Sequence, residues 1–437
     1  PNPQSPIPNP QSPIPNFIAY FIVKVNNYKS FYIKINKKRM EVKERKIEEK
    51  SYTLENSKNT FYILENEEEE EDKDNYGFHD LSFKEYYMNN NLFSHVITHL
   101  NSFLSKNKNS DEKIVINIQK ISEFIKNNKF TEDILESILL NGIPNNLHCL
   151  RPLVWKSFIG YFPPNDLSKW INIVKNNYTF YKLLKKKYQY FPGNIESPED
   201  KKIIIQLEKD LPRTRANVPF FHNKANLKKD SPETHYDIIK RILFFFAKEH
   251  SIGYIQGMNE LVSIIYYVFY NDDNPFFKKY IESDTYYCFS ALVADIEPIF
   301  HLNDVSFSQL FITQQIKEIN NILEKCEPDI NNFFKEITLS IDSFVMKWIM
   351  VLFAQEFKID VAVNFWDRMF TQKNKMKFIC FISVAILKKN KDKILGKEME
   401  DIVQWLKEMG NSINKIDINE IIQLAFDMKK EYSKIKK

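Results

Sequence analysis

Apolar residues recur at spacings of three and four along the sequence from about residue 114 to residue 430. Such a spacing collects them on one face of an α-helix, which turns once every 3.6 residues. The chain of 437 residues contains only 8 glycines, which disfavours folds built on many glycine turns. We therefore predict an all-α fold for this part of the chain, in which no strand pattern of comparable quality occurs.

Some of the predicted helices have recognisable ends. Thr131 is a candidate N-cap ahead of acidic residues, and Gly142 with Pro144 marks the end of that helix. Ser231 followed by Pro232 predicts the start of another helix. The helices that we expect from the periodicity are 131–142, 167–190, 201–210, 232–250, 257–270, 284–300, 307–325, 341–357, 361–370, 377–389, 398–409 and 418–430.

The residues before 114 have a different character. The first seven residues are repeated at positions 8–14, and their proline density predicts that 1–16 is disordered or extended. Residues 17–36 hold two aromatic and β-branched runs around Asn26 and Asn27, which predicts a β-hairpin. The acidic run 67–71 predicts a solvated segment. We expect a proline-rich repeat at 1–16, a poorly defined charged region at 17–113 and a helical domain at 114–437.

Composition excludes several classes of function. The 61 basic and 57 acidic residues nearly cancel, so the charge gives no case for nucleic-acid binding. The four cysteines form no C-x-x-C pair, which argues against a disulfide scaffold or a zinc site and favours reduced thiols in a cytoplasmic protein. The longest apolar stretches are about half of the ~20 residues that a membrane span needs, so we expect no transmembrane helix.

The motifs of self-contained catalysis are missing as well. The sequence has no phosphate-binding G-x-x-x-x-G-K-[ST], no dinucleotide-binding G-x-G-x-x-G, no H-E-x-x-H and no glycine-flanked serine. We therefore expect no hydrolase site, no metal and no cofactor of the chain's own.

Two segments place polar side chains where helices are interrupted. In segment 207–215, Pro212 biases the residue before it away from helical geometry, so the helix should end there. Arg213 would then lie on a loop, with Asp210 near enough to orient it. In segment 253–260, Gln256 would lie at the start of a strongly apolar helix. Each residue also has an ordinary structural explanation, a surface ion pair for Arg213 and a backbone cap for Gln256.

These segments belong to an ordered series of short motifs. The motifs are Gly142-Ile143-Pro144, Leu150-Arg151 with Val154-Trp155, Asp210 with Arg213, Tyr254 to Asn259, Ser343-Phe344 with Trp348, Leu352-Phe353 with Glu356-Phe357, and Phe365-Trp366-Asp367 with Phe370. The series resembles the TBC-domain family of Rab GTPase-activating proteins from about residue 118 to residue 430, and most resembles the branch known as member thirteen.

The resemblance implies a two-lobed helical domain that supplies two residues to a GTP-bound small GTPase. Arg213 matches the family's arginine finger, Gln256 its glutamine finger, and Asp210 the acid that positions the arginine. A planar cation can neutralise the charge of a transferring phosphoryl group, and an amide can both donate to and accept from the attacking water. Arg215 is a second arginine that could act as the finger, but the spacing from Asp210 favours Arg213.

The remaining motif residues have supporting roles in this interpretation. Tyr254, Gly257 and Asn259 flank Gln256, and Tyr254 and Asn259 either contact the partner or only shape the loop. The residues that we assign to the buried structure are Trp155, Trp348, Trp366 and the pair of Arg151 and Asp367.

The resemblance also implies a partner and a location. The partner is a GTP-bound Rab, which brings the GTP and Mg²⁺ with it. The chain would be cytoplasmic and peripheral to membranes that carry the Rab, with membrane recruitment only through the Rab. Two alternatives stay open at this point, a catalytically inactive Rab-binding scaffold and a helical adaptor that binds peptides in a groove.

Overall fold

The computed structural model of the chain describes residues 94–106, 112–126, 136, 140, 142–144, 146–163, 169–188, 197–227, 231–300 and 305–435. Within these ranges the regular elements are helices, apart from one isolated antiparallel bridge between Lys224 and Thr234. The predicted all-α fold is confirmed. The proline-rich repeat, the predicted hairpin and the acidic run lie outside the described residues, as does most of the predicted helix 131–142.

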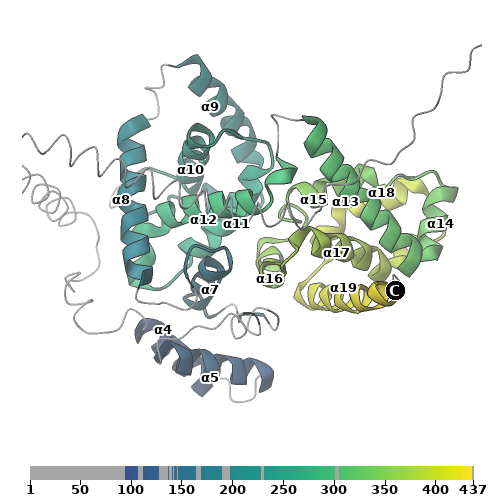
Figure 1. Cartoon of the computed structure of the whole chain (residues 1–437), viewed down its shortest axis with the longest axis horizontal. Coiled ribbons are helices and arrows are strands. Elements are labelled where there is room, and N and C mark those ends of the chain that lie inside the picture. Colours follow the sequence, from purple (N-terminus) through teal and green to yellow (C-terminus); the bar gives the residue numbers. More distant parts are fainter. Residues whose placement is uncertain are drawn as a thin grey trace, which may run out of the picture. The chain divides into compact units, whose positions relative to one another are not determined.

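A first group of helices surrounds α11, whose side chains are buried on almost every side (Figure 1). Helix α11 packs against α7, α10 and α12, and α12 also packs against α8. The helices of this group are α7 (Leu150–Phe158), α8 (Trp170–Tyr188), α9 (Pro198–Asp210), α10 (His235–Glu249), α11 (Met258–Tyr270) and α12 (Ile281–Asp295). Short 3₁₀ turns join them, namely η2 (Leu211–Arg213), η3 (Pro219–His222), η4 (Pro275–Tyr280) and η5 (Glu297–Ile299).

A second group is centred on α17, which packs against α13, α15 and α19. Its members are α13 (Val305–Cys326), α14 (Pro328–Glu336), α15 (Asp342–Met350), α16 (Ile359–Phe370), α17 (Lys375–Lys389), η7 (Lys391–Lys393), α18 (Met399–Ser412) and α19 (Lys415–Ile435). Helix α16 packs on α7 and α11 and so joins the two groups. The two-lobed helical arrangement expected from the sequence is present.

Helix α4 (Ser94–Lys106) lies before the expected domain start at residue 114 and packs against α5 (Glu112–Lys126). Val96 and Leu100 on α4 are fully buried. Their spacing is helical, but the pattern is too short to stand out beside the charged segment that precedes it. Helix α4 was not predicted, and it lies within the compact unit His79–Lys437.

Several predicted helix boundaries were wrong; the helix expected at 284–300, for example, is Ile281–Asp295. The helix expected at 341–357 ends at Met350, because Leu352 and Phe353 have left-handed backbone angles, with φ of 50° and 58°. The helix expected from Pro232 begins at His235 instead, because Thr234 and Asp237 form a capping box there. Helices α7 and α14 were not predicted, and Pro152 is tolerated in α7 because it lies in the first turn.

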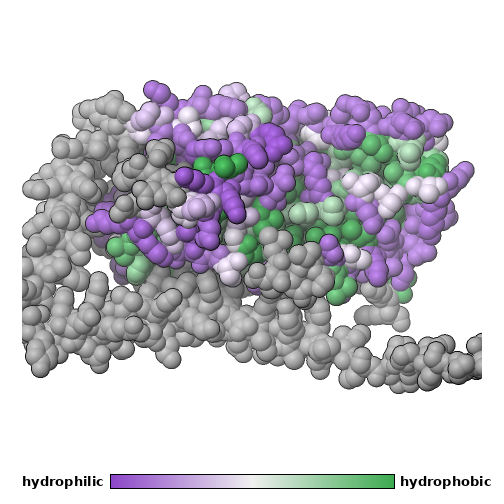
Figure 2. All heavy atoms as spheres, turned by 90° about the horizontal axis from the view of Figure 1, so that it is seen from above, coloured by the Kyte–Doolittle hydropathy of each residue, from purple (hydrophilic) through white to green (hydrophobic). Residues whose placement is uncertain are grey.

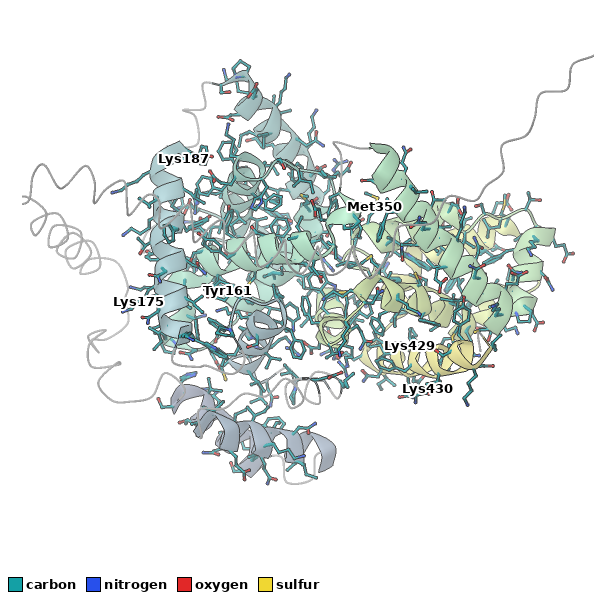
Figure 3. The ribbon with its side chains drawn as sticks, in the orientation of Figure 1. Tyr161, Lys175, Lys187, Met350, Lys429 and Lys430 are labelled. Carbon is teal, nitrogen blue, oxygen red and sulfur yellow. The ribbon has the colours of Figure 1, made fainter. Side chains whose placement is uncertain are left out.

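A buried ion pair joins α7 to α12 in the first group. Asp284 is fully buried and accepts hydrogen bonds from Lys156 Nζ and from the Tyr161 hydroxyl, each at 2.5 Å. Tyr161 lies among the helices in Figure 3, whereas Lys175 and Lys187 lie along α8. Burial raises the pKa of both Asp284 and Tyr161. A buried acid of this kind is tolerated because its oxygens have donors.

A second buried acid, Asp367 on α16, ties the two groups together. Arg151 Nε donates to Asp367 Oδ1 at 3.0 Å and Trp155 Nε1 donates to the same oxygen at 2.8 Å. Asp367, Trp155 and Trp366 are fully buried, and Trp348 is 1% exposed. The predicted pair and the predicted core positions of the three tryptophans are confirmed.

Hydrophilic side chains cover most of the face shown in Figure 2, with hydrophobic patches between them. The exposed large apolar residues of the described part include Leu183 on α8, Leu310 on α13 and Met346 on α15. No helix in the described ranges is long and apolar enough to cross a bilayer.

We predict that Asp367→Ala lowers the free energy of unfolding by about 3–5 kcal/mol, because Arg151 is left buried without its partner. The control is Asp360→Ala on the same helix, whose half-exposed carboxylate lies 3.4 Å from Lys415 Nζ. An exposed pair contributes only about 0–1 kcal/mol. Urea denaturation measures both changes, and equal losses would contradict the role given to Asp367.

Candidate functional site

Helix α9 ends at Asp210, and the chain continues through a 3₁₀ turn that contains Pro212 and Arg213. The Arg213 side chain is 70% exposed, whereas the Asp210 side chain is 4% exposed. Arg213 Nε donates to the Lys209 carbonyl and Nη2 donates to Asp210 Oδ1, both at 2.9 Å. Two hydrogen bonds therefore hold the Arg213 side chain while it remains exposed to solvent, as the sequence predicted.

The second loop places Gln256 directly before α11. Gly257 is the N-cap of this helix and has φ of 103°, a left-handed angle that favours glycine. A Cβ at Gly257 would lie 3.0 Å from Val351 Cγ1, so the loop also needs glycine for its close approach to the end of α15. The Gln256 side chain is exposed and has no hydrogen-bond partner within the described part of the chain.

Hydrogen bonds between side chains connect the two loops. The Tyr254 hydroxyl lies 2.8 Å from Asp210 Oδ2 and 3.1 Å from Asn259 Oδ1. Asn259 Oδ1 also accepts from the Gly257 amide at 3.0 Å. Asn259 Nδ2 donates to Thr214 Oγ1 at 2.7 Å, which connects the Gln256 loop to the loop that carries Arg213. We call Asp210, Thr214, Tyr254 and Asn259 the loop network.

The loop network is well suited to hold the loops rigid. Burial, and then the hydrogen bond to Asp210, raise the pKa of Tyr254, so its hydroxyl keeps the proton that it donates. The Thr214 hydroxyl donates to the Asp210 carbonyl at 3.0 Å. Because one Asp210 oxygen is bonded to Arg213 and the other to Tyr254, the carboxylate is already used by the protein and is a poor candidate for a metal ligand.

Arg215, the second candidate finger, is buried. Its side chain is 6% exposed, and Nη1 donates to the Phe357 carbonyl at 2.6 Å. Its Nε lies 3.7 Å from Glu260 Oε2. Burial lowers the pKa of Arg215 and raises the pKa of Glu260. Of the two arginines, only Arg213 can contact another molecule without a change in the fold.

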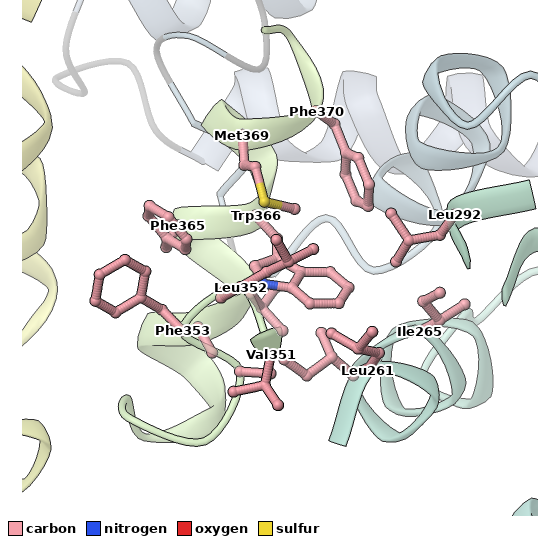
Figure 4. Close-up of a cluster of buried hydrophobic side chains, with 14 of the residues drawn as sticks. Leu261, Ile265, Leu292, Val351, Leu352, Phe353, Phe365, Trp366, Met369 and Phe370 are labelled. Carbon is pink, nitrogen blue, oxygen red and sulfur yellow. Dashed lines mark hydrogen bonds between the residues drawn. The ribbon is translucent and has the colours of Figure 1, made fainter. Parts of the chain in front are cut away.

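An apolar contact between the two helix groups supports the start of α11 (Figure 4). Leu261 and Ile265 of α11 face Val351 and Trp366 in this cluster. Trp366 Nε1 donates to the Leu352 carbonyl at 3.1 Å, which satisfies the backbone of the left-handed turn after α15. Gln256 therefore lies close to the start of a helix that contacts with both groups hold in place.

The structure brings together the residues that the sequence singled out. Arg213 and Gln256 are the exposed members, and Asp210, Tyr254, Gly257 and Asn259 form their support, as described above. Thr214 was missed, although it directly follows Arg213 and its hydroxyl could have been considered as a loop-bonding group.

Comparison with known proteins identifies the family. The family model described as the Rab-GTPase-TBC domain matches residues 148–395. The chain belongs to this family. TBC1 domain family member 13 of Homo sapiens is 28% identical over 213 residues, which cover 48% of this chain and 52% of that protein. This match confirms the predicted likeness to the member-thirteen branch, and the chain spans about half the length of the curated relatives that it matches.

Two further comparisons extend the likeness. The GTPase-activating protein GYP1 of Saccharomyces cerevisiae is 26% identical over 276 residues, covering 57% of this chain and 39% of that protein. The crystal structure of the Ypt/Rab-GAP domain of Gyp1p superposes with a TM-score of 0.62 at 22% identity, covering 73% of this chain and 99% of that one. At this identity, the superposition supports the fold alone.

We predict that Tyr254→Phe lowers the free energy of unfolding by about 1–3 kcal/mol, because it leaves Asp210 Oδ2 without its donor in the buried part of the loop network. Tyr267→Phe is the control, since the Tyr267 hydroxyl has no hydrogen bond to a described residue. Chemical denaturation of the two variants measures the difference. A Tyr254→Phe protein as stable as the Tyr267→Phe protein would contradict the role of the loop network.

Proposed function

We propose that the chain stimulates GTP hydrolysis by a Rab-family GTPase and supplies Arg213 and Gln256 to the nucleotide in trans. The observation that carries the proposal is the pairing of two exposed side chains on two loops that one buried network connects. The names of the relatives are consistent with this activity, since GYP1 is described as a GTPase-activating protein.

Arg213 would act on the charge of the transferring group. Phosphoryl transfer spreads negative charge over the γ-phosphoryl oxygens, and catalysis consists mainly of positioning and charge stabilisation. The Arg213 guanidinium is held through Nε and Nη2, so its orientation is fixed before the partner arrives. Little rotamer freedom is then lost in the complex, which favours the transition state.

Gln256 would act on the attacking water. A carboxamide has both an acceptor and donors, so it can orient the water toward the phosphorus and contact the nucleotide as well. Gly257 and Asn259 fix the backbone on which Gln256 is carried, and the exposed amide makes no bond that would have to be broken first.

The same proposal specifies the partner and the location. The GTP-bound Rab contributes the nucleotide and its Mg²⁺, so the chain has no cofactor of its own in this reaction. The protein would work in the cytoplasm at membranes that carry the Rab, in vesicle trafficking, and would reach those membranes through the Rab.

The first test is single-turnover GTP hydrolysis by a panel of purified Rab proteins with and without this chain. Acceleration of at least one Rab supports the proposal. Binding of a Rab without acceleration would identify a catalytically inactive scaffold. Neither binding nor acceleration across the whole panel would favour a helical adaptor and contradict the proposal.

For Arg213→Ala we expect the stimulated rate to fall by about 10³- to 10⁵-fold, which is the usual contribution of an arginine finger. Stability should fall far less than the rate, because the Arg213 side chain is exposed and water can take its place as the donor to Asp210 Oδ1. Arg213→Lys should remain strongly impaired, since lysine lacks the planar fork. Lys209→Ala is the control, as this exposed cation lies in the same turn. An equal loss in the control would mean that general positive charge, and not the finger, sets the rate.

For Gln256→Ala we expect most of the stimulated rate to be lost while binding to the Rab persists through Arg213. A Rab whose own water-orienting glutamine is changed to leucine should still respond to the wild-type protein, because Gln256 supplies the amide. If Gln256→Ala is fully active and the leucine-substituted Rab no longer responds, the Rab orients its own water and the two-finger mechanism is wrong.

A further inference from the structure

Three side chains from distant parts of the sequence meet away from the loop network. His95 lies on α4, Cys149 lies directly before α7, and Asp273 lies in the turn after α11. Each offers one ligand atom, and these atoms all lie within 4.8 Å of one another. A metal ion that bridges them would need only small side-chain adjustments, because metal–ligand bonds are about 2.0–2.3 Å long.

Two polar atoms of this cluster lack partners, although the Cys149 thiol contacts the Asp273 carboxylate. His95 Nδ1 and Asp273 Oδ1 are buried and make no hydrogen bond within the described part of the chain. Cys149 is fully buried. Buried polar atoms in proteins are nearly always paired, and an unpaired one costs free energy. A ligand that binds an imidazole nitrogen, a thiol sulfur and a carboxylate oxygen together would satisfy both unpaired atoms.

A neighbouring histidine adds to the cluster. His99 follows His95 by four residues on α4, so both lie on the same face of that helix. The two rings stack with centroids 4.3 Å apart. His99 Nδ1 lies 3.4 Å from Asp273 Oδ2 and can hold that carboxylate in place.

The donor set identifies the kind of metal. Zinc takes mixed sets of thiolate, imidazole and carboxylate ligands. Calcium and magnesium prefer oxygen ligands and would leave the thiol and the imidazole unused. Of these three ions, zinc is the one that fits all three donors.

We propose that the protein binds one Zn²⁺ through His95, Cys149 and Asp273, with His99 orienting the Asp273 carboxylate. The ion fastens α4 to the start of α7 and to the end of α11. Because α4 lies before residues 148–395, which the family model matches, the site would fix a helix from outside that region onto the domain. The sequence argued against zinc because its four cysteines are isolated; here one cysteine suffices, since the other donors come from α4 and from a turn more than 100 residues away.

The test measures metal content and coordination in the full chain. After incubation with Zn²⁺ and dialysis against metal-free buffer, the wild-type protein should retain about one zinc ion per chain. Replacement by Co²⁺ should give a thiolate-to-cobalt charge-transfer band in the near ultraviolet. Cys149→Ser should lose the band and the retained zinc, and Asp273→Asn should retain much less zinc than the wild type. His99→Asn should bind zinc about 10- to 100-fold more weakly, as expected when a residue that orients a ligand is removed.

Two controls separate this site from adventitious binding. His148→Asn changes an exposed residue next to Cys149, and Cys326→Ser removes a thiol outside the cluster. Both should keep the zinc and the cobalt band. Wild-type protein that retains no zinc and shows no charge-transfer band would overturn the proposal, as would a band that disappears in Cys326→Ser. The wild-type cobalt spectrum decides the question even if Cys149→Ser fails to fold.

Discussion

One oxygen of the buried Asp210 carboxylate accepts a hydrogen bond from Arg213 and the other accepts one from Tyr254. A single acid therefore contacts both loops that carry the candidate site. Because this carboxylate is buried, its oxygens need hydrogen-bond donors, and this requirement makes the arrangement specific. Asn259 also bonds to Thr214, the residue directly after Arg213, and so links the two loops a second time. The exposed arginine and glutamine can be oriented before a partner binds because their supports are fixed to each other.

The rest of the domain holds this network in place. Gly257 is the N-cap of α11, where the left-handed angle and the close approach to Val351 both favour glycine. Asp367 binds Arg151 and Trp155 and so fastens α16 to α7. The site thus lies on the first helix group, but its precise backbone position depends on contacts with the second. Substitutions far from Arg213 can be expected to reduce activity by moving α11.

Much of this arrangement could be predicted from the sequence. Helical periodicity locates most helices. The spacing of Asp210 and Arg213 correctly predicts that their side chains interact, and the structure has a direct hydrogen bond between them. Local patterns could not reveal that Leu352 and Phe353 are left-handed, because the turn is held by the Trp366 hydrogen bond and by packing on α11. They also could not reveal that Arg215 is buried, since its partner is a carbonyl 142 residues away. The His95, Cys149 and Asp273 cluster was missed for the same reason. Contacts between residues distant in sequence leave no periodic signal.

The most direct test of the central claim is the structure of the protein bound to a responsive Rab that carries GDP and aluminium fluoride, a mimic of the transferring phosphoryl group. We predict that the Arg213 guanidinium contacts the fluoride and that the Gln256 amide contacts the water in line with it, with the bond between Asp210 and Tyr254 retained. A complex in which the glutamine of the Rab orients this water, or in which Arg213 lies away from the fluoride, would contradict the account.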